Sequence, residues 1–271
     1  IYDIDIIIGN DRANELAVAV AEKRRDCIAF IGIPAKFDEY LISEEGEHLY
    51  TPDGKLLIFN TGSIPLKPKE IDIHNVQEYI STIPNSMFVH FTCNLKYQYD
   101  GFTNTHKKVN LAGDIAGLKA QASLKTPWMP SAGLERGNIK NMDHTFPVFD
   151  MNKSNFFTKK GLNVIHKGNV LMSQRTFTER KSAFDRVHVR SVFNHMEKNV
   201  ERILRRFIFL ENTRALREEI ASVIKRLLKE IKSSQGIDGG RVEVTRKGEK
   251  EIIVDIYIKP KFVAEFIQLR M

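Results

Sequence analysis

The chain has 271 residues, 42% of them apolar, which is enough to bury a hydrophobic core in one or two domains. No run approaches the roughly eighteen apolar residues of a membrane span, and the N-terminus lacks the pattern of a signal peptide. The formal charge of +7, from 41 basic and 34 acidic residues, favours an anionic partner without identifying it. We therefore expect a soluble, unsecreted protein whose anionic partner is nucleic acid, lipid or an acidic protein.

The start of the chain predicts a strand, a helix and a second strand, over Ile1 to Ile8, Ala13 to Arg24 and Cys27 to Ile33. Two short apolar strands joined by a helix favour a parallel sheet covered by helices. Because Ile1 already lies in a strand-like run, the sequence is expected to begin inside a longer protein. Gly9 alone lacks the spacing of a phosphate-binding loop and is expected to form a structural turn.

Residues 41–68 are predicted to form a hairpin or surface insertion, because a Pro-Asp-Gly turn signal precedes the strand-like KLLIFN. A helix is expected over Asn75 to Ser81 and a strand over Met87 to Cys93. Residues 150–161 are polar and are predicted to be irregular, which marks a domain junction. We divide the chain into an α/β domain, residues 1–142, and an α+β domain, residues 143–271.

The second domain is predicted to contain two short strands, two amphipathic helices and a hairpin. The apolar stripe of the first helix contains Val192, Phe193, Met196, Val200, Ile203, Leu204 and Phe207. The second helix covers about Thr213 to Ser233, and its stripe contains Leu216, Ile220, Val223, Leu227 and Ile231. Gly236 and Gly239-Gly240 are expected to end it. Two alternating strands, Arg241 to Thr245 and Glu251 to Ile258, follow.

Catalysis is not expected from this sequence. The eight histidines form no HExxH motif, and none stands with Cys or Asp at metal-ligand spacing. Cys27 and Cys93 lie in apolar stretches without a CxxC pair and are predicted to be buried thiols. Trp128 in its Pro-rich loop is expected to be an anchor rather than a ligand-stacking platform. We predict no enzyme activity, no cofactor and no metal site.

Basic residues gather on one polar side of the second helix, namely Lys225, Arg226, Lys229 and Lys232. They suit either a solvated helix end, where cations complement the helix dipole, or a partner-binding face. A basic nucleic-acid-binding protein is the alternative function. Against it, acidic residues such as Glu218 and Glu230 are interleaved with the basic ones, and no helix-turn-helix or repeated exposed aromatics are recognisable.

The end of the chain has two possible roles. A two-stranded hairpin is at best marginally stable alone, and its free edges can be completed by other strands. The strand-like run Phe262 to Leu269, after the break at Pro260, forms either a local third strand or an arm that pairs with another subunit. The residues by themselves favour the local third strand.

Collinear motifs in this sequence resemble the tail sheath proteins of contractile-tailed bacteriophages, in particular those of the large myovirus branch. The motifs are NLKYQYDGF (94–102), VNLAGDIAGLKA (109–120), PWMPSAGLERGNI (127–139), FDRVHVRSVFNHM (184–196) and IKPKFVAEFIQL (258–269). The resemblance implies the C-terminal portion of a sheath subunit, with an α/β domain followed by an inner domain that contacts the tail tube.

The resemblance also implies a function and partners. The subunit would polymerise as sixfold rings in a helical sheath, contract to drive the tube into the host envelope, and contact the tube, baseplate and tail terminator proteins. It would be assembled in the host cytoplasm, lie in the virion tail, and bind neither nucleic acid nor membrane. The basic helix residues Lys225, Arg226, Lys229 and Lys232 would bind the tube. The strand exchanged between subunits would be Phe262, Val263, Ala264, Glu265, Phe266, Ile267, Gln268 and Leu269.

Overall fold

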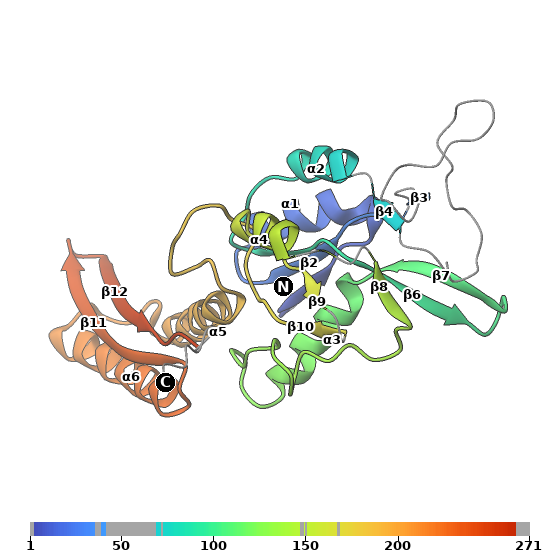
Figure 1. The fold of residues 1–271 in the computed structure, drawn as a ribbon. Coiled ribbons are helices and arrows are strands. Elements are labelled where there is room, and N and C mark those ends of the chain that lie inside the picture. The colour runs from blue at the N-terminus through green and yellow to red at the C-terminus, as the bar shows by residue number, and fades with distance from the viewer. Residues whose placement is uncertain are drawn as a thin grey trace, which may run out of the picture. The chain divides into compact units, whose positions relative to one another are not determined.

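The computed structural model describes residues 3–35, 39–41, 69–71, 73–146, 149, 151–166 and 169–263 (Figure 1). The chain divides into two compact units. Unit 1 comprises Ile1–Lys125 and Met129–Val187, and unit 2 comprises Thr126–Trp128 and His188–Met271.

This division falls later in the chain than the predicted boundary between residues 142 and 143. The reason is that the segment after residue 143 stays bonded to unit 1. Thr92 forms a parallel bridge with Asn163, and Ser86 forms an antiparallel bridge with Phe177. The side chain of Asn163 also donates to the Phe91 carbonyl oxygen at 3.2 Å.

Unit 1 is built around a parallel sheet of three strands in the order β1-β2-β5. The strands are β1 (Ile6–Ile8), β2 (Ile28–Gly32) and β5 (Val89–Thr92). All residues of β2 are buried, as expected of a strand covered on both faces. Successive side chains of a strand point to opposite faces, so Ile28 and Phe30 join one core cluster and Ala29 and Ile31 join another.

Two helices cover the two faces of this sheet (Figure 1). Helix α1 (Asn14–Arg24) places Val18 and two buried alanines in one core cluster. Helix α3 (Ala112–Ser123) places Ile115 and Ala116 in the other. The predicted helix-covered parallel sheet is therefore confirmed.

Gly9 turns the chain from β1 into the 3-10 turn Asp11–Ala13. Its N–H donates to the Phe30 carbonyl oxygen at 2.9 Å, so the amide is used within the sheet. A Cβ at this position would lie 2.7 Å from both Asn14 Oδ1 and Ile31 Cγ2, so a side chain here would force Asn14 or Ile31 to move. The glycine has the structural role that the sequence predicts.

A second sheet of unit 1 is antiparallel, in the order β7-β6-β8. Its strands are β6 (Leu95–Asp100), β7 (Thr105–Asn110) and β8 (His144–Phe146). The other elements of unit 1 are β3 (Glu39–Leu41), β4 (Lys69–Ile71), α2 (Ile73–Thr82), α4 (Met151–Lys159), β9 (Ile165–His166) and β10 (Val170–Leu171). The interior of the predicted insertion, residues 42–68, lies outside the described residues.

Helix α4 corrects the prediction that residues 150–161 are irregular. Phe157 is 1% exposed and packs against Phe149, with ring centroids 5.0 Å apart. Ser154, one turn earlier on the same side, is also buried. Tertiary packing of buried side chains such as Phe157 and Ser154 therefore stabilises a helix in a segment whose composition is polar.

Unit 2 consists of two helices and a long hairpin. Its elements are α5 (Val187–Leu204), the 3-10 turn η2 (Arg205–Phe207), α6 (Arg214–Ser233), β11 (Ile237–Lys247) and β12 (Glu251–Pro260). Both helices, the hairpin and Trp128 form one core cluster. Thr213 caps α6, because its side chain accepts a hydrogen bond from the Leu216 N–H.

The start of β11 differs from the prediction. Gly239 and Gly240 lie within the strand, at a register irregularity next to Ile237, instead of ending α6. Of the three glycines, only Gly236 lies at the end of the helix. Its N–H donates to the Ile231 carbonyl oxygen at 2.9 Å. Glycine inside a strand is typical of such irregularities. The sequence alone does not distinguish a glycine in this position from a glycine that ends a helix.

Candidate functional site

Four basic side chains lie together on the exposed side of α6, as the sequence predicts. We call Lys225, Arg226, Lys229 and Lys232 the basic face; all four are exposed. None of them forms an ion pair with any described residue. Elsewhere on the same helix, by contrast, Arg214 Nε lies 2.8 Å from Glu218 Oε1. The charge of the basic face is thus not neutralised within the described chain.

The burial pattern of α6 explains why the basic face points outward. The buried residues follow steps of four and then three, and they are Leu216, Ile220, Ile224, Leu228 and Ile231. The predicted stripe differs at two positions, because Val223 and Leu227 are only half-buried. The basic residues fall on the other side of the helix. Glu230 is the one acid among them in the segment 225–232.

The hairpin β11–β12 has one covered and one exposed face. Val242 pairs with Ile256, and both belong to the core of unit 2, so one face lies against the helices. On the other face the Arg241 guanidinium lies 4.3 Å from the centre of the Tyr257 ring. In the described part of the chain neither strand pairs with a third. Both edges therefore present main-chain groups that could bind another strand.

The predicted intersubunit strand begins just after this hairpin. Phe262 and Val263 are 56% and 38% exposed and are not in a strand. The remaining residues of the run lie outside the described residues; they are Ala264, Glu265, Phe266, Ile267, Gln268 and Leu269. Strand exchange through this run stays a prediction.

Trp128 anchors the segment Thr126–Trp128 in the core of unit 2. Its side chain is 8% exposed, and Nε1 donates to the Ser234 carbonyl oxygen at 3.2 Å. The ring also packs edge-on against His195, with centroids 5.5 Å apart. A buried indole with its N–H satisfied cannot serve as an open stacking platform, so the predicted anchor role is confirmed.

Buried ionisable groups occupy the interior of unit 1. His90 on β5 is 1% exposed and stacked on Phe30, and burial lowers the pKa of its imidazole to about 3. Burial also lowers the pKa of Lys119 to about 8, and its ammonium donates to the Met129 carbonyl oxygen at 3.4 Å.

Cys27 and Cys93 are both free and buried, as predicted, and burial raises the pKa of each thiol. In the parts of the chain that the structure describes, no cluster of three or more His, Cys, Asp or Glu residues is placed to hold a metal ion. Within the same ranges, no helix combines the length and the apolarity needed to cross a bilayer.

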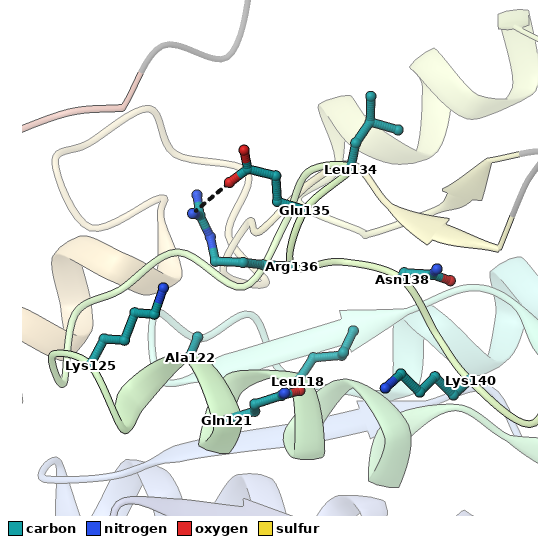
Figure 2. A pocket seen from close by; sticks show the side chains of 9 residues that line it. All are labelled: Leu118, Gln121, Ala122, Lys125, Leu134, Glu135, Arg136, Asn138 and Lys140. Atoms are coloured by element: carbon teal, nitrogen blue, oxygen red, sulfur yellow. Dashed lines mark hydrogen bonds and ion pairs between the residues drawn. The ribbon is translucent and has the colours of Figure 1, made fainter.

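The sequence did not reveal three exposed features. Phe102, at the turn between β6 and β7, is 99% exposed. The corner between α5 and α6 exposes Ile208, Phe209 and Leu210, and Phe209 has a positive φ of 68°. Unit 1 also has a hollow of about 340 Å³ beside α3 (Figure 2). The sequence does not predict these features, because tertiary packing decides which apolar side chains are exposed.

Comparisons with solved structures identify proteins with a similar fold. A sheath complex of an extracellular contractile injection system (PVC), in the contracted state, matches with a TM-score of 0.64 and 18% identity, over 75% of this chain and 61% of that one. The contracted helical sheath of the anti-feeding prophage matches with a TM-score of 0.62 and 17% identity, over 70% and 57%. The chain therefore has the mixed α/β fold of contractile sheath proteins.

Sequence comparisons find similar proteins among phage tail sheath proteins. The tail sheath protein of Vibrio phage KVP40 is 28% identical over 99% of this chain and 41% of its own length. That of Enterobacteria phage T4 is 30% identical over 64% of this chain and 27% of its own length. No protein-family model matches the sequence. The chain is a relative of the tail sheath proteins of contractile-tailed phages, and it spans less than half the length of these relatives.

Proposed function

We propose that the chain is part of a structural subunit of a contractile phage tail sheath. The subunit polymerises as sixfold rings in a helical sheath around a tail tube, in the virion tail, and contracts to drive the tube into the host envelope. It is assembled in the host cytoplasm, its partners include the baseplate and tail terminator proteins, and it carries out no catalysis. Similarity to tail sheath proteins over nearly the whole chain supports this function.

The observation that carries the proposal is the basic face. Four exposed cations lie on one side of a helix and have no ion pair with the described residues. Holding like charges together without partners is unfavourable in a free protein and becomes favourable against an acidic surface. In our proposal the tail tube supplies that surface, and unit 2 is the part of the subunit that contacts it.

Charge reversal tests the tube contact. The double variant Lys225→Glu/Lys229→Glu should lose co-sedimentation with purified tail tubes, and increasing salt should weaken wild-type binding in the same way. The matched control is Lys250→Glu/Lys261→Glu, which changes the charge equally at exposed positions outside the basic face. The control should still bind tubes, and circular dichroism should show both variants folded.

A nucleic-acid-binding function would give a different result in the same experiment. Wild-type chain that binds duplex DNA as tightly as tubes at physiological salt, with both activities lost in the basic-face variant, would favour that alternative. Normal tube binding by the basic-face variant would place the tube contact elsewhere.

We further propose that β11–β12 is completed by strands of other subunits, with Phe262–Leu269 as the donated strand. The two open edges of the hairpin support this role. Deleting residues 262–271 should leave a folded monomer that melts cooperatively but does not polymerise. Loss of the cooperative transition would indicate a local third strand instead, and normal sheath formation by the truncated chain would exclude strand exchange through this run.

A further inference from the structure

One side chain in the core of unit 2 comes from a short segment whose neighbours in sequence belong to unit 1. Unit 1 contains the chain up to Lys125 and again from Met129, and the segment Thr126–Trp128 between them belongs to unit 2. We call these three residues the strap. The chain enters the strap soon after helix α3, and the Lys125 N–H still donates to the Ala122 carbonyl oxygen at 3.1 Å. The strap therefore supplies a side chain to unit 2 from the middle of the sequence of unit 1.

That side chain, Trp128, is closely packed in unit 2. Among the described residues, it is the one aromatic side chain that is buried in the core cluster of this unit. A Cβ on Gly236 would lie 2.8 Å from Trp128 Cε2, so the backbone after α6 approaches the indole closely. The indole N–H is satisfied by the Ser234 carbonyl oxygen. Because aromatic side chains contribute much of the stability of a core, unit 2 depends on Trp128 being in place.

Unit 1 holds the chain immediately after the strap. Lys119 on α3 is 4% exposed, and its Nζ donates to the Met129 carbonyl oxygen at 3.4 Å. The next carbonyl oxygen, that of Pro130, accepts a hydrogen bond from Arg136 Nε at 2.9 Å. Ser131 follows and is buried. The three residues after the strap are thus fixed within unit 1.

Two prolines limit the conformational freedom of the strap. Pro127 precedes the tryptophan and Pro130 follows it, and each proline ring fixes φ at about −65°. With its flanks held, Trp128 has less backbone entropy to lose when it packs into unit 2. If unit 1 unfolded, these flanks would be released, and the same packing would carry a larger entropic cost. The fold of unit 1 therefore favours the fold of unit 2.

We propose that the strap makes the stability of unit 2 depend on unit 1, so that the two units unfold together. The chain also passes from one unit to the other at Val187 and His188, and changes to the strap leave that connection intact. A chain coupled in this way resists the opening of unit 2 while unit 1 is folded. The coupling belongs to the free chain and requires neither a tube nor polymerisation, so its failure would leave the proposed function intact.

The chain contains natural reporters of the two units. Trp128 is its one tryptophan and reports on unit 2 by fluorescence, whereas Cys27 and Cys93 are buried in unit 1 and report on it by brief thiol labelling. In urea, the two signals of the wild-type chain should change with the same midpoint. Inserting Gly-Gly between Trp128 and Met129 should separate them, with the fluorescence midpoint lower by at least about 0.5 M.

The matched control places the same insertion between Gly101 and Phe102, in the exposed turn after β6. This control should keep the fluorescence and thiol midpoints coincident, because it leaves the strap unchanged. Separate midpoints in the wild-type chain would overturn the inference, as would coincident midpoints in the strap insertion.

A core substitution in unit 1 tests the coupling without changing the strap. Phe91→Leu should lower the stability of unit 1, and it should therefore lower the fluorescence midpoint of Trp128 as well as the thiol midpoint. In the chain with the strap insertion, the same substitution should lower the thiol midpoint alone. A fluorescence midpoint that Phe91→Leu leaves unchanged in the uninserted chain would overturn the inference, whether or not the insertion variant folds.

Arg136→Ala tests whether unit 1 positions the strap. Because Pro130 loses its hydrogen bond, local opening should become more frequent, and acrylamide should quench the fluorescence of Trp128 about twofold more strongly. Lys140→Ala, which changes an exposed residue of the same loop, is the matched control and should leave quenching unchanged. Equal quenching in the two variants would mean that unit 2 alone holds the indole, which contradicts the inference.

Discussion

The central strand of unit 1 and the hairpin of unit 2 differ in how completely their main chains are paired. Strand β2 pairs on both sides, with β1 and β5, and every residue in it is buried. Strands β11 and β12 are about twice as long, yet they pair only with each other among the described residues, and one of their faces is exposed. Unit 1 therefore has a core that the chain completes itself, whereas unit 2 has edges and charges that other chains could complete.

The largest effect should come from emptying the closed core. Phe91 is fully buried in unit 1 and packs against Phe177, with ring centroids 5.2 Å apart. Phe91→Ala should lower the free energy of unfolding by about 3–5 kcal/mol, measured by urea denaturation. Tyr257→Ala, on the exposed face of the hairpin, should cost less than about 1 kcal/mol. Equal costs would contradict the difference between the two regions.

Acid should destabilise unit 1 through His90. Its pKa is lowered from 6.5 to about 3 in the folded protein, so between these values the unfolded chain binds a proton that the folded chain does not. The free energy of unfolding should therefore fall as the pH drops from 6.5 toward 3, with a slope from this residue of up to about 1.4 kcal/mol per pH unit. In His90→Leu the slope should be smaller by that amount. Identical slopes in urea titrations of the two proteins would show that His90 is not buried in its neutral form.

A smaller effect should separate packing from hydrogen bonding in unit 2. Trp128→Phe keeps most of the apolar contact and removes the donor to the Ser234 carbonyl oxygen. The free energy of unfolding should fall by about 1 kcal/mol, measured by circular dichroism. A loss as large as that of Phe91→Ala would mean that the indole ring, rather than its N–H, holds the segment Thr126–Trp128.

The elements predicted well from the sequence are those with a strong local pattern. The run from Cys27 to Ile33 is apolar throughout, and it forms the buried strand β2. The alternation of Ile252, Val254, Ile256 and Ile258 matches the covered face of the hairpin. In both cases the residues that pack together are close in sequence, so the spacing of the apolar residues predicts the structure.

The features that were missed depend on distant contacts. Helix α4 depends on the packing of Phe157, and Gly239-Gly240 belongs to a strand because of its partner residues on β12. The basic face could be predicted because it repeats along one helix. The hollow could not, because its lining residues come from α3 and from the loop of residues 134–140, which meet only in the folded chain. Likewise, nothing local distinguishes the exposed Phe102 from the buried Phe91.

Hydrogen exchange along the hairpin tests the central claim most directly. In free chain, the edge amides of β11 and β12 should exchange quickly while those of β2 are protected. In chain assembled into sheath, the edge amides of the hairpin should slow by at least about tenfold, and β2 should be unchanged. Unchanged exchange of the hairpin in assembled sheath would contradict the account, because the open edges would then remain unpaired in the polymer.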